Sequence, residues 1–201
     1  MAALLHRQGR HLRSVVGHPE RSSGALRAVA AAGSSCWVAL QPFAAVDAAP
    51  DSAPHPLSRE LLEAVLADRT SDRFVCELVW PRLGYARDAA GRWCAGPSTE
   101  ARWREAFPVE PQFIAERPPS VALTRSIAKE HKQLLKEQLA FAGYRIGELY
   151  PRRTRRATAV NWLLAHLAER GEPLPEAGPL PPLLEMPADP VAGHPGDLPV
   201  R

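Results

Sequence analysis

Four arginines lie close together in the segment LYPRRTRRATAVNWLL (149–164), at positions 152, 153, 155 and 156. Guanidinium groups beside the free N–H groups of a helix start can bind carboxylates or phosphates. A helix start also carries partial positive charge, so cations placed there are unfavourable unless an acid or an anion compensates them. The cluster therefore raises the question of what neutralises it.

Helical geometry divides the four arginines into two pairs. At 100° per residue, we expect Arg153 and Arg156 to project toward the protein body and Arg152 and Arg155 to point outward. Three interpretations remain open. The inward pair could form ion pairs with Glu137, Glu148 or acids within 60–116. Alternatively, the cluster could bind an anion such as a nucleic-acid phosphate, or dock on an acidic protein surface.

The cluster ends a basic block, because residues 125–156 carry a net charge of +6 whereas residues 157–201 carry −4. Three lysines in the block are spaced i, i+3, i+7, which places them in one helical stripe. The candidate binding surface comprises Lys129, Lys132, Lys136, Arg145, Arg152, Arg153, Arg155, Arg156 and Trp162. Trp162 lies opposite the expected apolar stripe, so it is either covered by the hairpin described below or an exposed anchor for a partner.

The sequence lacks the patterns of common catalytic sites: it has no HExxH, GxSxG, P-loop or GxGxxG motif. It also lacks an RRM signature, a KH loop and a zinc finger. We therefore expect no enzymatic activity, no metal and no cofactor. The function predicted is a non-enzymatic accessory or binding module whose basic surface at 129–156 contacts an acidic protein partner. The alternative is an RNA-associated protein that binds phosphates through the same residues.

The elements that must position these residues are mainly helical. Apolar spacing and capping residues predict about five helices and one short β-hairpin in a single small domain over residues 57–170. The helices are expected near 58–66, 72–79, 97–107, 128–139 and 151–169, and the hairpin over 85–94. Residues 108–127 are broken by prolines and predicted to be extended in part.

Both ends of the chain differ in composition from this domain. Residues 1–46 hold five arginines and one acid, which is typical of an organelle transit peptide, and we assign 1–56 to a transit peptide and linker. Residues 171–201 hold nine prolines and few large apolar groups, which predicts a disordered tail. No apolar run approaches the ~20 residues that a membrane span requires. Cys76 and Cys94 are expected to be ordinary thiols, with a regulatory pairing left open.

Four segments resemble a small family of cyanobacteria and photosynthetic plastids that is known only as a domain of unknown function. They are VCELVWPRLGY (75–85), RPPSVALTRSI (117–127), KEQLAFAGYRIGEL (136–149) and PRRTRRATAVNWLL (151–164). The resemblance covers roughly residues 57–169 and transfers no catalytic or binding residue. Together with the N-terminal composition, it implies import into the chloroplast stroma, with the mitochondrion as the lesser alternative. The acidic partner would then be a stromal protein or complex.

Overall fold

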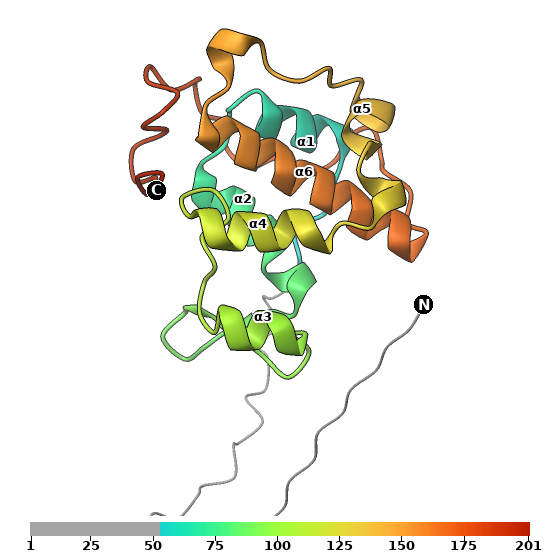
Figure 1. Ribbon diagram of the computed structural model, residues 1–201, viewed down its shortest axis with the longest axis vertical. Helices are drawn as coiled ribbons and strands as arrows, with labels where there is room; N and C mark the ends of the chain where they lie inside the picture. Colours follow the sequence, from blue (N-terminus) through green and yellow to red (C-terminus); the bar gives the residue numbers. More distant parts are fainter. Residues whose placement is uncertain (1–52) are drawn as a thin grey trace, which may run out of the picture. The chain divides into compact units, whose positions relative to one another are not determined.

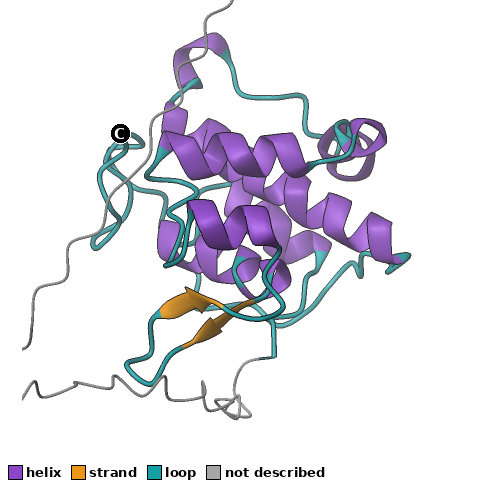
Figure 2. Ribbon diagram, turned by 60° about the horizontal axis from the view of Figure 1, so that its bottom comes forward, coloured by secondary structure: helices purple, strands orange, loops and turns teal. Residues whose placement is uncertain are grey.

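The computed structural model describes residues 53–201, so nearly all of the predicted transit peptide and linker lies outside the described residues. Over the described range the chain forms six α-helices, three 3₁₀ helices and a two-stranded antiparallel hairpin (Figures 1 and 2). The predicted class, a mainly helical single domain with a minor hairpin, is confirmed. The elements are α1 (Arg59–Leu66), α2 (Asp72–Val79), η1 (Pro81–Leu83), β1 (Tyr85–Arg87), β2 (Trp93–Ala95), α3 (Ala101–Ala106), α4 (Arg117–Ser126), η2 (Lys129–His131), α5 (Leu134–Leu139), η3 (Ile146–Glu148) and α6 (Pro151–Arg170).

Helices α1 and α2 begin where the sequence predicts, because each has a serine that caps its free N–H groups. Ser58 Oγ accepts the N–H of Leu61, and Ser71 Oγ accepts the N–H of Phe74. Each helix buries the apolar face of its eight residues. In the loop between them, residues 67–71, Asp68 and Thr70 are buried whereas Ala67 and Arg69 are exposed.

Helix α6 is the centre of the domain and contacts α1, α2, α4 and α5 (Figure 1). In Figure 1, α1 and α4 lie on opposite sides of α6. Its buried residues include Val160, Leu163, Leu164 and Leu167, which continue the stripe predicted from spacing. Because the helix is enclosed on several sides, its first turn also faces other parts of the chain.

The hairpin forms over the residues predicted, with Tyr85 opposite Ala95 and Arg87 opposite Trp93. Tyr85 and Trp93 are both buried, and the Trp93 ring lies 5.8 Å from that of Trp80. Asp88 holds the turn by accepting the N–H groups of Ala90 and Arg92 through one carboxylate oxygen. Three residues per strand suffice here because two aromatic side chains anchor the hairpin to the helices.

Residues 108–127 were predicted to be broken by prolines and extended in part. Val109 does pair with Cys94 in an isolated β-bridge, but the prediction is wrong for residues 117–126, which form α4. Pro118 and Pro119 occupy the first turn, where a backbone N–H has no partner within the helix and its loss costs little. The expected helix over 128–139 is also shorter, since η2 covers 129–131 and α5 begins only at Leu134. In α4, the prolines thus lie at the start of a helix instead of breaking one.

The predicted disordered tail is a second error, because residues 171–201 pack along the domain without forming a helix or strand. Carbonyls of Pro175 and Glu176 accept the N–H groups of Arg59 and Glu60, the unpaired donors at the start of α1. The N–H of Leu184 donates to the carbonyl of Arg69 at 2.9 Å. Prolines reduce the entropy that this segment loses on ordering, and its carbonyls satisfy donors that the helices leave free.

Candidate functional site

The start of α6 places Arg152 and Arg156 on one face, four residues apart, and that face points into the protein. Their side chains are 1% and 0% exposed. The two arginines extend the apolar stripe of α6 by two turns, so the face that buries Val160 and Leu163 also buries them. Buried guanidinium groups need compensating charges, which must come from elsewhere in the chain.

Three aspartates provide those charges to Arg152. Its Nε donates to Asp72 Oδ2 at 2.7 Å, and its Nη1 donates to both carboxylate oxygens of Asp68 at 2.8 and 2.6 Å. Its Nη2 donates to Asp197 Oδ2 at 3.1 Å. Asp68 and Asp72 flank the α1–α2 loop, whereas Asp197 belongs to the C-terminal segment.

Arg156 is bonded almost as fully and shares Asp72. Its Nη1 donates to Asp72 Oδ1 at 2.6 Å, and its Nη2 donates to the carbonyl and hydroxyl of Thr70 at 2.9 and 2.8 Å. The carbonyl of Val65, at the end of α1, accepts from Nε and Nη2. We call Arg152, Arg156, Asp68, Asp72 and Asp197 the buried charge cluster.

Burial and charge act against one another in this cluster. Burial raises the pKa of Asp72, although the charge of Arg156 and a hydrogen bond from Arg152 oppose the shift. Burial disfavours the charged form of Arg152, but hydrogen bonds to Asp68 and Asp72 outweigh this and raise its pKa. Arg152 therefore stays charged, and the aspartates occupy its donors. The cluster holds α1, α2, α6 and the C-terminal segment together.

The arrangement confirms internal pairing, the first of the three interpretations, but reassigns the residues. Arg156 points inward as predicted, whereas the outward orientation predicted for Arg152 is wrong. Residues 152 and 156 lie only 40° apart around a helix, closer than the 60° between 153 and 156, so the i, i+4 pair shares the buried face. Because both are buried, neither belongs to the exposed surface of the protein.

The other two arginines of the segment are partly covered. Arg153 is 14% exposed and lies over the rings of Tyr144 and Tyr150, at 5.7 and 6.0 Å from their centroids. Arg155 Nη1 donates to the carbonyls of Ile114 and Ala115, both at 2.8 Å. The expected outward orientation of Arg155 is therefore only partly realised, because its guanidinium already binds backbone oxygens.

Trp162 was included in the candidate surface, but it is buried, with 7% exposure. Its Nε1 donates to Ser126 Oγ at 3.0 Å, and its ring stacks on that of His166 at 5.4 Å. The interpretation that Trp162 is covered is confirmed, although α4 and not the hairpin provides Ser126. The role of exposed anchor is excluded for this residue.

The three lysines lie at the surface, but the prediction of one helical stripe is wrong, because Lys129 is in η2, Lys136 is in α5 and Lys132 lies between them. Lys129, Lys132, Lys136 and Arg145 are all exposed. Lys132 borders a groove of about 280 Å³ between α4, α5 and α6. The groove is lined by Thr124, Ile127, Lys132, Leu135, Thr154, Ala157, Thr158 and Asn161. We call Lys129, Lys132 and Lys136 with this groove the lysine groove; it combines an apolar floor with a basic edge.

Asn161 stabilises the lysine groove through two hydrogen bonds. Its Oδ1 accepts the N–H of Leu135 at 2.9 Å, near the start of α5, and its Nδ2 donates to the carbonyl of His131 at 3.2 Å. The side chain thus joins η2 and α5, which display the lysines, to the central helix α6. Asn161 is therefore a structural hydrogen-bonding residue.

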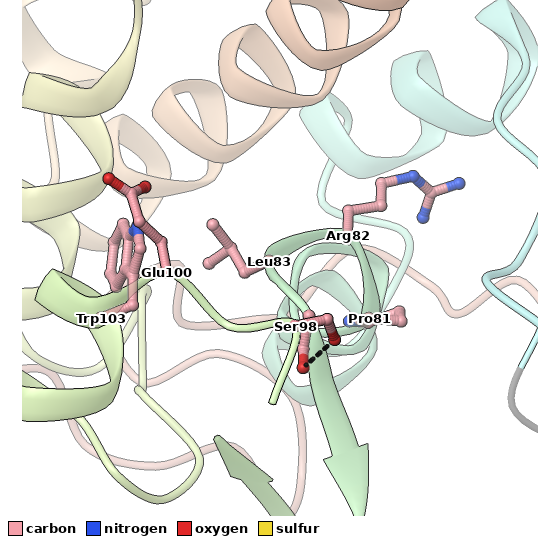
Figure 3. Close-up of a pocket in the computed structure, with 7 residues that line it drawn as sticks. Pro81, Arg82, Leu83, Ser98, Glu100 and Trp103 are labelled. Atoms are coloured by element: carbon pink, nitrogen blue, oxygen red, sulfur yellow. Dashed lines mark hydrogen bonds between the residues drawn. The ribbon is translucent and has the colours of Figure 1, made fainter. Parts of the chain in front are cut away.

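Figure 3 shows a second, larger cavity of about 360 Å³, lined by Pro81, Arg82, Leu83, Gly84, Ser98, Glu100 and Trp103. Ser98 Oγ donates to the carbonyl of Gly84 at 3.2 Å, so no base activates this hydroxyl. Arg82 donates to the carbonyls of Leu78 and His55, and burial lowers its pKa to about 10. The arrangement stabilises the turn after η1 and offers no catalytic combination of nucleophile and base.

Cys76 is buried, and its pKa is raised to about 12 by burial, which makes it an unreactive thiol at neutral pH. Cys94 is partly exposed. Within residues 53–201, no group of three or more His, Cys, Asp or Glu side chains is placed to hold a metal ion. Over the same range, no helix is long and apolar enough to cross a membrane.

Comparison with known proteins now defines the class of this chain. The family model Domain of unknown function (DUF1823) matches residues 56–168, and the chain belongs to this family. The resemblance inferred from the four segments is thereby confirmed. A protein solved by solution NMR is 48% identical with a TM-score of 0.51; the match covers 60% of this chain and all of that one. Comparison with curated proteins gave no match.

The sequence did not reveal the acidic half of the buried charge cluster. Asp68 and Asp72 lie 84 residues from the arginines that they pair with most closely, and Asp197 lies in the segment predicted to be disordered. One signal was present: two aspartates, four residues apart, flank a turn between two amphipathic helices. Such a pair complements two arginines at the same spacing, but only the fold brings them together.

Proposed function

We propose that this protein is a non-enzymatic binding module whose lysine groove contacts an acidic segment of a partner protein. The observation that carries the proposal is the apolar groove with Lys132 at its edge, while Lys129 in η2 and Lys136 in α5 are exposed nearby in the chain. Partner helices and strands bury apolar side chains in such grooves, while charged rims select the partner by electrostatic complementarity.

The proposal narrows the surface considered from sequence. Arg152, Arg156 and Trp162 are excluded because they are buried, and Arg145 stays as an exposed cation beyond α5. The fixed geometry at Asn161 supports the proposal, since a preorganised groove loses less entropy on binding than a mobile loop does.

RNA is the alternative partner because the same lysines could bind phosphates. The apolar lining from Ile127, Leu135 and Ala157 favours a protein segment, since phosphate recognition makes no use of such a floor. The two partner classes are separable by experiment, as described next.

The test is a pull-down with the full chain, comparing wild type with Lys132→Glu/Lys136→Glu, with and without RNase. The matched control is Arg102→Glu/Arg170→Glu, which changes charge by the same amount at exposed positions on α3 and at the end of α6. We expect a protein lost only with the lysine variant and kept after RNase. Recovery of the same proteins by all three chains would contradict the proposal, and loss after RNase would favour RNA.

We further propose that the module works in the chloroplast stroma. The basic, acid-poor composition of residues 1–46 and the resemblance to plastid proteins support this location. Fusion of residues 1–56 to a fluorescent protein tests it. Plastid fluorescence is expected; mitochondrial or cytosolic fluorescence would contradict it.

A further inference from the structure

The C-terminal segment reaches the buried charge cluster through two side chains. His194 Nε2 lies 2.9 Å from the carbonyl oxygen of Asp68 and 3.6 Å from Asp68 Oδ1. The second side chain is that of Asp197. Its Oδ1 accepts the N–H of Asp72, at the start of α2, at 2.8 Å. Its Oδ2 accepts from Arg152 Nη2 at 3.1 Å and from the N–H of His194 at 2.8 Å. A carboxylate that takes donors from a helix start and a guanidinium is held as a bound ligand would be.

The other residues of 193–201 also lie against the domain, in a cleft bordered by Asp72, Cys76 and Ile114. Gly193 has φ +83° and lies so close to Arg152 that an added Cβ would stand 2.6 Å from Nε, which requires glycine. At the other end, the N–H of Arg201 donates to the carbonyl of Ala115 at 2.7 Å, and Arg155 Nη2 donates to the carbonyl of Arg201 at 2.8 Å. The segment is thus held at both ends and through Asp197 between them.

Charge counting shows that Asp197 is not required to neutralise the two buried arginines. Asp68 and Asp72 already supply two negative charges for Arg152 and Arg156. Asp197 instead accepts hydrogen bonds from two donors that Asp68 and Asp72 do not satisfy. They are the Nη2 group of Arg152 and the backbone N–H of Asp72. Both donors belong to the domain that the family model covers, whereas the model ends at residue 168, before Asp197.

Residues 193–201 do not fill this cleft completely. A cavity of about 260 Å³ lies beside Gly196, Asp197 and Leu198, with Cys76 and Ile114 among its lining residues. Leu198 is 49% exposed, so this apolar side chain is only partly buried by the cleft. A peptide with a larger or better placed apolar residue after its aspartate would bury more surface here.

We propose that this cleft is a second binding site, for an acidic peptide segment of another protein, and that residues 193–201 occupy it in cis. The donors of Arg152 and Asp72 select the carboxylate, and the cavity takes the apolar residue beside it. The C-terminal segment must leave before the partner binds. A tethered segment has a high effective concentration, so it competes with the partner for the cleft. The partner's apparent affinity is therefore reduced, and it binds only at concentrations high enough to displace the segment.

The test uses the full chain and a labelled synthetic peptide with the sequence of residues 188–201. Wild type is compared with Asp197→Ala, and Glu185→Ala is the control that removes an exposed acid from the same segment. We expect the peptide to bind Asp197→Ala about tenfold or more tightly than wild type or the control, since one charge-assisted hydrogen-bond set in cis is lost. The peptide carrying Asp197→Asn should bind about tenfold more weakly.

Equal affinity for all three chains would overturn the proposal, as would no binding to an Asp197→Ala chain that melts like wild type. Should this variant fail to fold, hydrogen exchange of the wild type decides. The amide of Arg201 should exchange at least about a hundredfold faster than those of Leu163 and Leu164 in α6, through local opening. Exchange as slow as in α6 would overturn the proposal, because the segment would then open only when the domain unfolds.

Discussion

Two parts of one basic block, residues 125–156, have opposite environments. At its end, Arg152 and Arg156 are buried and paired with aspartates. Lys129, Lys132 and Lys136 are exposed, and Lys132 borders an apolar groove. The difference shows that a run of positive charge in a sequence is not by itself a binding surface. Which part is available depends on where acids distant in the sequence lie.

Arginine suits the buried positions of this block, and lysine suits the exposed ones. Arginine keeps its charge when buried and donates in several directions, so Arg152 can bind three carboxylates at once. Lysine is strongly hydrated and is better suited to an exposed edge. The buried arginines stabilise the fold, whereas the exposed lysines are available for recognition at the surface.

The largest effect is expected from Arg156→Ala. Its removal leaves the Asp72 carboxylate with less compensation and takes donors from Thr70 and Val65, so the free energy of unfolding should fall by about 3–5 kcal/mol. Urea unfolding measures it. The control is Arg145→Ala, an exposed cation of the same block, which should change stability by no more than about 0.5 kcal/mol. If both variants lost an equally small amount of unfolding free energy, Arg156 would have to lie at the surface.

Asn161→Ala should lower the free energy of unfolding by about 1–3 kcal/mol, because the N–H of Leu135 and the carbonyl of His131 lose their partners. Hydrogen exchange in α5 should also become faster. The control is Thr158→Ala, since the Thr158 hydroxyl donates only to the carbonyl of Thr154 in its own helix. An unchanged α5 in the Asn161 variant would show that the lysine groove is held by other contacts.

Alkaline pH should destabilise the protein through Cys76. Burial raises the pKa of this thiol to about 12 in the folded state from 9.0 in the unfolded chain. The unfolded state therefore releases a proton first, and the free energy of unfolding should fall by up to about 1.4 kcal/mol per pH unit above pH 9. Urea unfolding from pH 8 to about pH 10 tests this.

Cys76→Ala is the matched variant for that titration. Its unfolding free energy should be lower at neutral pH because of the cavity, yet should fall less steeply above pH 9 than that of the wild type. The remaining fall comes from Cys94, whose pKa burial also raises, and then from buried Tyr85. An equal slope in both chains would assign the alkaline loss to another group.

The smallest effect on stability is expected from Lys129→Ala/Lys136→Ala. Both side chains are exposed, so each should change the free energy of unfolding by no more than about 0.5 kcal/mol, measured by urea unfolding. A loss comparable to that of Arg156→Ala would mean that the lysines, too, belong to the fold.

Local signals in the sequence were enough for much of the fold. Serine caps located the starts of α1 and α2, and the spacing of Tyr85 and Trp93 located the hairpin. Helix α4 was missed because Pro118 and Pro119 were taken as breakers, although in a first turn they are compatible with a helix. Errors of this kind could be avoided from sequence by weighing where in a helix a proline would fall.

The remaining errors concern contacts across long separations. Arg152 pairs with residues 80 and 84 positions earlier, and with Asp197, 45 positions later. Periodicity reports which residues share a face, but not which acids the folded chain brings to that face. The C-terminal segment was misjudged for the same reason, because its order comes from donors on α1, α2 and α6 and not from its own composition.

We claim that the arginines at the start of α6 act within the fold. The most direct test is a double-mutant cycle of unfolding free energies with Arg156→Gln and Asp72→Asn, in about 0.1 M and about 1 M salt. We predict a coupling free energy above about 1 kcal/mol that salt barely changes, because the pair is buried. A coupling near zero, or one abolished by salt, would contradict the claim and return Arg156 to the surface.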